Sequence, residues 1–178
     1  LLDGTGDYLS LAADSDFTFA GDFTVDCWIR TTVCTVAYRR VCQFLAAGLA
    51  ALEVYIQRSD DPNAGELAVG MDGTGAAIIG TTSIIDGAWH HVAVVRSGSS
   101  TKLFVDGVQE GSTFTNSSTL TPDGTIYVIG TNSGINSYFD GHIDEFRVLK
   151  GEAAWTSNFT PPTSAYVVPA SASFFQLF

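Results

Sequence analysis

Positively charged side chains are scarce in this sequence: its 178 residues hold 8 Lys and Arg against 19 Asp and Glu, a formal net charge of −11. A nucleic-acid partner requires basic residues that neutralise phosphates, so this balance argues against one. Long apolar runs are also missing, and no stretch approaches the roughly 18 residues that indicate a transmembrane helix. We therefore expect no membrane span. The chain opens without Met or a signal-peptide pattern, as is typical of a processed protein or a piece of a longer one.

Cysteine is nearly absent, with three residues in all. Cys27 shares a face of an expected strand with Phe23 and Ile29, so we predict that it is a buried thiol. Cys34 and Cys42 flank a short segment, and we predict a disulfide between them. That bond would close a small loop, contribute about 2 kcal/mol and imply an oxidising compartment.

Apolar residues make up 46% of the chain and aromatic residues 12%, which is ample material for the core of one domain. The clearest pattern runs from Trp89 to Glu110. Apolar residues alternate along His90–Arg96, turn residues follow at Ser97–Ser100, and Asp106-Gly107 supplies a tight turn. These features predict three antiparallel strands. Since both faces carry apolar side chains, we expect both to be covered.

Similar short segments predict the other strands. They are Tyr8–Leu11, Phe17–Phe19, Phe23–Arg30, Val41–Leu45, Ala51–Gln57, Glu66–Met71, Ala77–Ile85, Thr125–Ile129 and Tyr138–Lys150. A polar loop is expected over Ser112–Thr121, and at most one short helical turn over Gly151–Trp155. The predicted fold is all-β, a two-sheet antiparallel β-sandwich of jelly-roll type. Residues 1–162 form the domain and residues 163–178 an apolar C-terminal tail.

Four of these stretches also carry a family resemblance. They are Leu2–Leu9 (LDGTGDYL), Gly21–Arg30 (GDFTVDCWIR), Trp89–Val108 and Phe139–Val148 (FDGHIDEFRV). In this order they resemble the laminin-G-like group of concanavalin A-like lectin and glucanase jelly rolls, over about residues 1 to 162. Thr31–Ala51 departs from the family pattern in length and cysteine content.

Some concanavalin A-like folds are glycoside hydrolases, which need two carboxylates about 5 Å apart in the retaining case. The nearest candidates here, Asp144 and Glu145, are neighbours and should point to opposite faces of a strand. His90 and His91 diverge for the same reason, without a partner at metal-ligand spacing. We therefore expect no enzymatic activity, and place the chain in the non-catalytic branch of the family it resembles.

The segment Asp3–Asp7 offers two carboxylates on a flexible loop. In the family that the chain resembles, the first and last strands lie side by side. The resemblance therefore implies that Asp3 comes close to Asp144, and that Asp3, Asp7 and Asp144 hold a structural calcium ion. The alternative is a turn whose aspartates cap backbone amides.

Two sequons, at Asn116 and Asn158, are possible N-glycosylation sites in a glycosylating host.

The function we predict is non-enzymatic recognition and assembly on an extracellular or virion surface, with a glycan or a surface protein as partner. A structural subunit of a filament, capsid or tail would bury a large apolar surface in the assembly. The alternative is a dedicated carbohydrate-binding lectin module of a larger secreted protein or glycoside hydrolase. A lectin would present exposed polar and aromatic residues on one loop rim, for which Asp60–Asn63 and Asn132–Tyr138 are candidates.

The tail bears on assembly, because residues 159–178 contain no charged side chain. Its candidate contacts are Tyr166, Val168, Phe174, Phe175, Leu177 and Phe178. The tail can form an edge strand of its own domain, or it can add to a neighbouring copy and make a homo-oligomer or polymer.

Overall fold

The computed structural model describes every residue except 13, 47–48, 122–125, 167–174 and 178. Seven strands form the first sheet: β1 (Leu2–Asp3), β3 (Phe23–Arg30), β8 (His90–Ser97), β9 (Ser100–Val105), β10 (Val108–Thr115), β12 (Asp140–Lys150) and β13 (Phe175–Leu177). Six form the second: β2 (Leu9–Leu11), β4 (Arg39–Ala46), β5 (Leu49–Ile56), β6 (Glu66–Met71), β7 (Ala76–Ser83) and β11 (Tyr127–Ile129).

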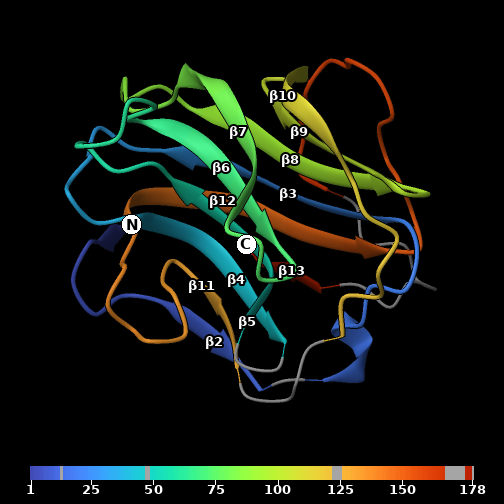
Figure 1. The fold of residues 1–178 in the computed structure, drawn as a ribbon. Coiled ribbons are helices and arrows are strands. Elements are labelled where there is room, and N and C mark those ends of the chain that lie inside the picture. The colour runs from blue at the N-terminus through green and yellow to red at the C-terminus, as the bar shows by residue number, and fades with distance from the viewer. Residues whose placement is uncertain (13, 47–48, 122–125, 167–174, 178) are drawn as a thin grey trace.

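The two sheets pack face to face, as Figure 1 shows. The strand order is β1-β12-β3-β8-β9-β10 in the seven-stranded sheet, where β13 also pairs with β12, and β2-β11-β4-β5-β6-β7 in the six-stranded sheet. Every pairing is antiparallel. The predicted antiparallel jelly-roll β-sandwich is confirmed. Among the described residues, no helix has the length and apolar character needed to cross a membrane.

Strand β3 shows how the sequence pattern builds the core. Its alternate residues Val25, Cys27 and Ile29 are buried between the two sheets. Asp26 and Trp28 therefore lie on the outer face of the seven-stranded sheet, because side chains alternate across a strand. The expected bounds of β3 and of β6 agree with the structure, and Cys27 is a buried free thiol as predicted.

Two segments differ from the prediction in their type of structure. The expected strand at Phe17–Phe19 is instead a 3-10 turn at Ser15–Phe17, followed by an isolated bridge from Phe19 to Leu120. The turn forms because Asp14 accepts two hydrogen bonds, one at its side chain from the Asp16 amide and one at its carbonyl from the Phe17 amide. Strand β10 also runs into the segment that we expected to be a loop, as far as Thr115.

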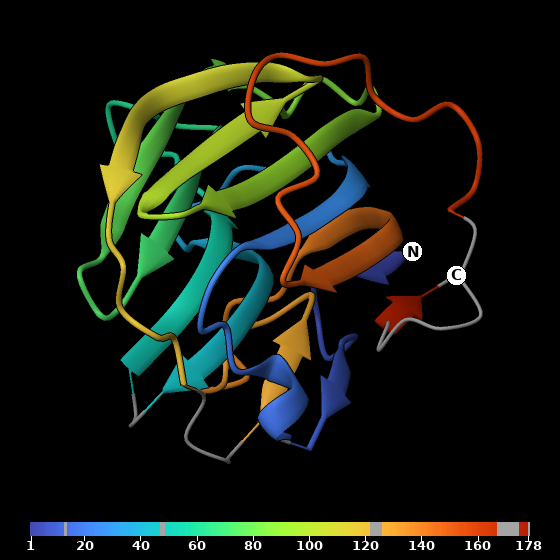
Figure 2. The same ribbon diagram turned by 90° about the vertical axis from the view of Figure 1, so that its right-hand side faces the viewer.

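Residues 151–166, which we call the strap, cross the outer face of the seven-stranded sheet after β12 (Figure 2). Trp155 and Phe159 of the strap stack on each other and pack over a buried outer cluster of Ala93, Val95 and Phe104. The core covers the other side of these strands, so the expected two-sided cover of β8 and β9 is confirmed.

No helical turn forms over Gly151–Trp155, which agrees with the expected limit of at most one. Thr24 on β3 donates a hydrogen bond through Oγ1 to the Glu152 carbonyl (2.9 Å) and accepts one from the Ala154 amide (2.9 Å). The backbone groups that a helical turn would pair with each other are therefore bonded to the sheet.

The tail returns to its own domain at β13, where Leu177 lies opposite Phe146 and Phe175 opposite Val148 of β12. This pairing corresponds to the edge-strand alternative for these three residues. Tyr166 also contacts its own domain, and its role as an assembly contact stays a prediction. Val168, Phe174 and Phe178 lie outside the described residues.

Candidate functional site

A cleft of about 420 Å³, which we call the tryptophan cleft, lies on the outer face of the seven-stranded sheet. Trp28, Trp89, Asp144 and Glu145 line it from the sheet, and strap residues 162–165 line it from the other side. Trp89 immediately precedes β8 and keeps 40% of its surface exposed. Two indole rings and two carboxylates thus meet at one accessible hollow.

A β-bulge on β12 brings the two carboxylates together. Asp144 lies opposite Trp28 and Arg147 opposite Asp26, so β12 has one more residue than β3 over this interval. Glu145, inside the bulge, adopts a positive φ of 49°. The expectation that Asp144 and Glu145 point to opposite faces was wrong, because a bulge interrupts the alternation of a regular strand. A left-handed backbone at a non-glycine residue costs about 1–3 kcal/mol and is enriched at functional sites.

Both carboxylates already accept backbone hydrogen bonds. Asp144 Oδ1 accepts one from the Glu145 amide (2.9 Å), and Glu145 Oε2 accepts one from the Tyr166 amide (3.0 Å). A carboxylate has about four acceptor positions, so Asp144 can also accept hydrogen bonds from the hydroxyls of a ligand.

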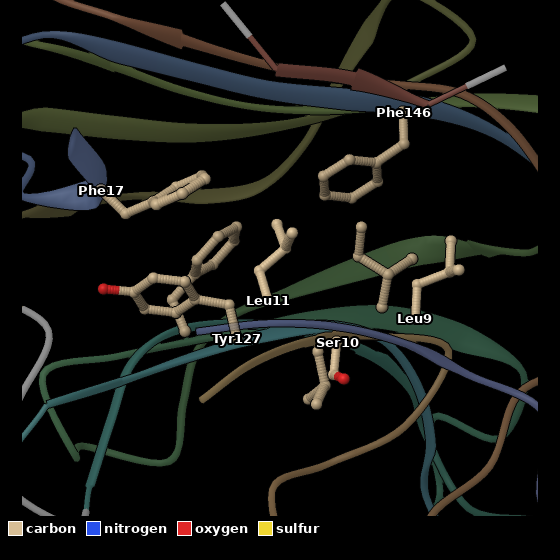
Figure 3. Close-up of a pocket in the computed structure, with 9 residues that line it drawn as sticks. Leu9, Ser10, Leu11, Phe17, Tyr127 and Phe146 are labelled. Carbon is tan, nitrogen blue, oxygen red and sulfur yellow. The ribbon is translucent and has the colours of Figure 1, made fainter. Parts of the chain in front are cut away.

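A second hollow, of about 150 Å³, opens between the two sheets and is shown in Figure 3. Phe146 enters it from the seven-stranded sheet, opposite Leu9, Leu11 and Tyr127 of the six-stranded sheet. The ring of Tyr127 lines this hollow, and its hydroxyl donates a hydrogen bond to the Asp14 carbonyl (3.1 Å). The lining is almost wholly apolar, so it offers few groups that could orient a polar ligand.

The outer face of the six-stranded sheet carries a polar cluster centred on Glu53. The Glu53 carboxylate accepts a hydrogen bond from Gln43 (2.8 Å) and pairs with the Arg40 guanidinium (3.1 Å). The guanidinium lies over the Tyr55 ring at 4.3 Å and the Tyr38 ring at 5.0 Å. Burial, and then the Glu53 charge, raises the pKa of Tyr55 to about 12.

The two loops predicted to form a binding rim flank this same cluster. Arg58, beside the first loop, pairs with Asp60 (3.0 Å) and lies over the Tyr38 ring. In the second loop, the Ser133 amide donates to Gln43 Oε1 (2.8 Å). The two predicted loops therefore do flank one face, the outer face of the six-stranded sheet. The side chains of the Glu53 cluster occupy that face and bond one another there.

The comparisons with known proteins agree with the fold. A laminin G family model, described as the concanavalin A-like lectin/glucanases superfamily, matches residues 3–156. The chain belongs to this superfamily. No curated protein sequence gives a significant match.

Among solved structures, this concanavalin A-like domain is similar to domains LG4-5 of the mouse laminin α1 chain, with a TM-score of 0.61 and 21% identity over 83% of the chain. It is also similar to a heptameric SAP-like pentraxin from Limulus polyphemus (TM-score 0.61, 16% identity, 98% of the chain and 89% of the pentraxin). A third is domain 4 of the extracellular GH43 arabinanase AbnA from Geobacillus stearothermophilus, solved with arabinotriose. Its TM-score is 0.58 and its identity 16%, and the match covers 86% of the chain and 83% of the arabinanase domain. The chain spans 39% of the laminin chain. These likenesses show the shared fold.

The predicted calcium residues only partly converge in this concanavalin A-like domain. The first strand does pair with β12, but Asp3 lies opposite Asp140, a residue that the sequence analysis missed. Asp3 Oδ1 accepts a hydrogen bond from the Thr5 amide (2.8 Å), and Asp7 Oδ2 accepts one from the Asp3 amide (3.3 Å). These bonds correspond to the alternative in which the aspartates cap backbone amides. Asp7 and Asp144 line one hollow of about 340 Å³. No three His, Cys, Asp or Glu side chains of the described residues are grouped to hold a metal ion.

The predicted disulfide is absent, since Cys34 and Cys42 are free thiols. The Cys42 side chain is buried in the core, whereas Cys34 lies before β4 and its thiol donates to the Gln57 carbonyl (3.2 Å). A bulge in β4 turns Val41 and Cys42 inward together. The Cys42 sulfur is thus buried in the core, whereas the Cys34 sulfur lies outside it.

His90 is held between two aspartates. His90 contacts Asp106 (2.7 Å) and Asp86 (3.1 Å), partners that the sequence analysis did not anticipate.

The two sequon asparagines both accept backbone hydrogen bonds. Asn116 is half-buried, and its side chain accepts a hydrogen bond from the Ser118 amide. Asn158 is exposed, and its side chain accepts from the Gln109 amide. Use of the two sequons stays a prediction.

The sequence analysis missed the tryptophan cleft. Trp28 could have been placed on the outer face from its alternation with Cys27 and Ile29. The bulge at Glu145 and the path of the strap leave no comparable signal.

Proposed function

We propose that this domain is a non-enzymatic recognition module that binds glycan in the tryptophan cleft. The observation that carries the proposal is the accessible pairing of Trp28 and Trp89 with Asp144 and Glu145. The apolar C–H face of a sugar ring packs against an indole, and the sugar hydroxyls donate hydrogen bonds to carboxylates. Ligand sites typically combine such an apolar lining with a few polar groups.

The comparisons support this proposal. The family is one of lectins and glucanases, and a domain of similar fold from an arabinanase was solved with arabinotriose. Arabinotriose is therefore the first probe.

The proposal is non-enzymatic because the carboxylates act as structural acceptors. Hydrolysis needs an acid and a nucleophile or base on either side of the scissile bond. Asp144 and Glu145 are adjacent in one bulge, and each already holds a backbone amide. We expect no turnover of oligosaccharides by the purified domain. Hydrolysis that is lost in both Asp144→Asn and Glu145→Gln would show that the cleft is an active site.

Calorimetric titration with arabinotriose, cellotriose and chitotriose tests the binding. Trp89→Ala should lower affinity for the bound sugar about 5- to 150-fold, because stacking on exposed aromatic rings contributes about 1–3 kcal/mol in comparable sites. Val36→Ala is the control, since Val36 is 71% exposed and does not line the cleft. Equal affinity of wild type and Trp89→Ala would overturn the assignment of the site.

The setting that we propose is an extracellular or virion surface, with assembly into a homo-oligomer or filament as a second candidate function. The uncharged segment from residue 159 to 178 motivates assembly. Ending the chain after Tyr166 keeps the strap and removes β13. Light scattering should then show a smaller species than the full chain, and an unchanged mass would exclude the tail as an inter-subunit contact.

Calcium at the edge where β1 meets β12 is also a proposal. Asp3, Asp7 and Asp144 do not form a complete cage, so the ion would need backbone carbonyls and water as further ligands. If calcium binds the folded domain, it raises the melting temperature and a chelator lowers it. Identical melting in calcium and in chelator ends this proposal.

A further inference from the structure

A buried polar cluster fixes the end of the strap. At its centre is Asp26, whose side chain is fully buried on the outer face of β3. Its carboxylate accepts two hydrogen bonds from the Arg147 guanidinium, from Nε to Oδ1 (2.9 Å) and from Nη2 to Oδ2 (3.1 Å). This fork is the geometry in which an arginine recognises a carboxylate most specifically.

The Tyr166 side chain completes the cluster. Its hydroxyl donates to Asp26 Oδ2 and lies 3.2 Å from His91 Nε2. The Arg147 guanidinium stacks over the Tyr166 ring at 3.7 Å. Burial, followed by the Asp26 charge, raises the pKa of Tyr166, so the phenol stays a proton donor at neutral pH. We call Asp26, His91, Arg147 and Tyr166 the tyrosine latch.

The latch is connected directly to the tryptophan cleft. The Tyr166 amide donates to Glu145 Oε2 (3.0 Å), and Glu145 lines the cleft. Residues 162–165, which form the opposite wall, end at Tyr166. The strap is bonded to the first sheet at Phe159, whose amide donates to the Gly107 carbonyl (2.9 Å), and again at Tyr166. The position of that wall therefore depends on Tyr166.

We propose that Tyr166 is a positioning residue for the tryptophan cleft. By anchoring the strap on Asp26 and holding Glu145, it sets the distance between the tryptophan wall and the strap wall. A sugar is then bound between two preorganised walls, which lowers the ordering cost of binding. This inference rests on the proposed glycan binding.

Tyr166→Phe is the sharpest test, because it removes one hydroxyl and keeps the ring under Arg147. Tyr127→Phe is the matched control, since it removes a hydroxyl that donates to the Asp14 carbonyl at the edge of the other sheet. Both variants should fold, and Tyr166→Phe should lose more in melting temperature because its hydroxyl bonds a charged carboxylate. Tyr166→Phe alone should lower the affinity for arabinotriose, cellotriose or chitotriose about tenfold, as expected for a lost hydrogen bond to a charged group.

Amide hydrogen exchange over residues 163–166 separates positioning from general stability. We expect exchange there to be about tenfold faster in Tyr166→Phe than in wild type, with no such change in Tyr127→Phe. Bound sugar should slow this exchange in wild type and much less in Tyr166→Phe.

The outcomes distinguish the two proposals. A wild-type domain that binds none of the three sugars overturns the proposed function, and the exchange data then decide alone whether Tyr166 positions the wall. Binding that Trp89→Ala abolishes but Tyr166→Phe leaves unchanged supports the function and overturns the positioning role. Exchange at residues 163–166 that is equal in wild type and Tyr166→Phe also overturns it.

Discussion

The two outer faces of the sandwich each hold a charged residue at their centre, but they shield it in different ways. On the seven-stranded sheet, Asp26 is covered by a chain segment, the strap, and is bonded by Arg147 and Tyr166. On the six-stranded sheet, Glu53 is shielded by side chains of its own sheet, Gln43 and Arg40. Only the first arrangement creates a wall that stands apart from the sheet, and hence a cleft beside it.

Close packing is part of the second arrangement. A Cβ atom added at Gly70, opposite Glu53 on β6, would come within 2.6 Å of Glu53 Oε1. The glutamate therefore lies flat on the neighbouring strand because glycine leaves room for it. A buried carboxylate on a sheet face therefore does not by itself mark a binding site. What matters is whether a separate segment covers it.

The largest effect is expected from Asp26→Asn. The variant leaves the Arg147 guanidinium without its counter-charge, and breaking a buried pair in this way costs about 3–5 kcal/mol. Urea denaturation should show a lower midpoint with little change in slope. A loss below that of the matched change on the other face would contradict the central role given to the latch.

Glu53→Gln is that matched change. The amide keeps the shape of the side chain, and Arg40 retains its contacts with the rings of Tyr38 and Tyr55. The change also removes the counter-charge of Arg40, but Glu53 keeps 10% of its side chain exposed whereas Asp26 is fully buried, so the expected loss is smaller, about 1–3 kcal/mol. Sugar binding should be unchanged, whereas Asp26→Asn should weaken it. Equal effects of the two variants on sugar affinity would remove the functional difference between the faces.

A smaller effect concerns His90, next to Trp89. Burial on its own lowers the pKa of His90, but hydrogen bonds to Asp106 and Asp86 and their charges outweigh it, so the pKa is raised. The protonated form is therefore stabilised by folding. That contribution is complete below the unfolded pKa of about 6.5 and disappears as pH rises through the folded value. The stability gap between wild type and His90→Gln should be wider at about pH 5.5 than at about pH 8.5. A constant gap would mean that His90 does not titrate with folding.

The smallest effect is chemical rather than energetic. Burial raises the pKa of Cys27 and raises that of Cys42 to about 12, so neither thiol should react in the folded domain. Native alkylation should add one label, at Cys34, and alkylation after unfolding without reductant should add three. A single label after unfolding would indicate a disulfide.

Much of the fold follows from local pattern. The alternation along β3 and along β8 to β10 predicted strands, faces and the antiparallel pairing, because a strand with period-two apolar residues must bury one face. The same pattern placed Cys27 in the core. The sequence also indicated that β1 pairs with β12, through the family resemblance.

The site was decided by tertiary structure. The Asp26–Arg147 fork joins residues 121 apart in the chain, and the Asp26–Tyr166 bond joins residues 140 apart. Neither pair has a local signature. From the sequence alone, an Asp, Arg or Tyr on the outer face of a strand is expected to be exposed to solvent. The bulge that turns Glu145 beside Asp144 is likewise set by the register between β12 and β3. Alternation fixes the face of a side chain in a regular strand, but only the packed sheets and the strap determine which residues meet there.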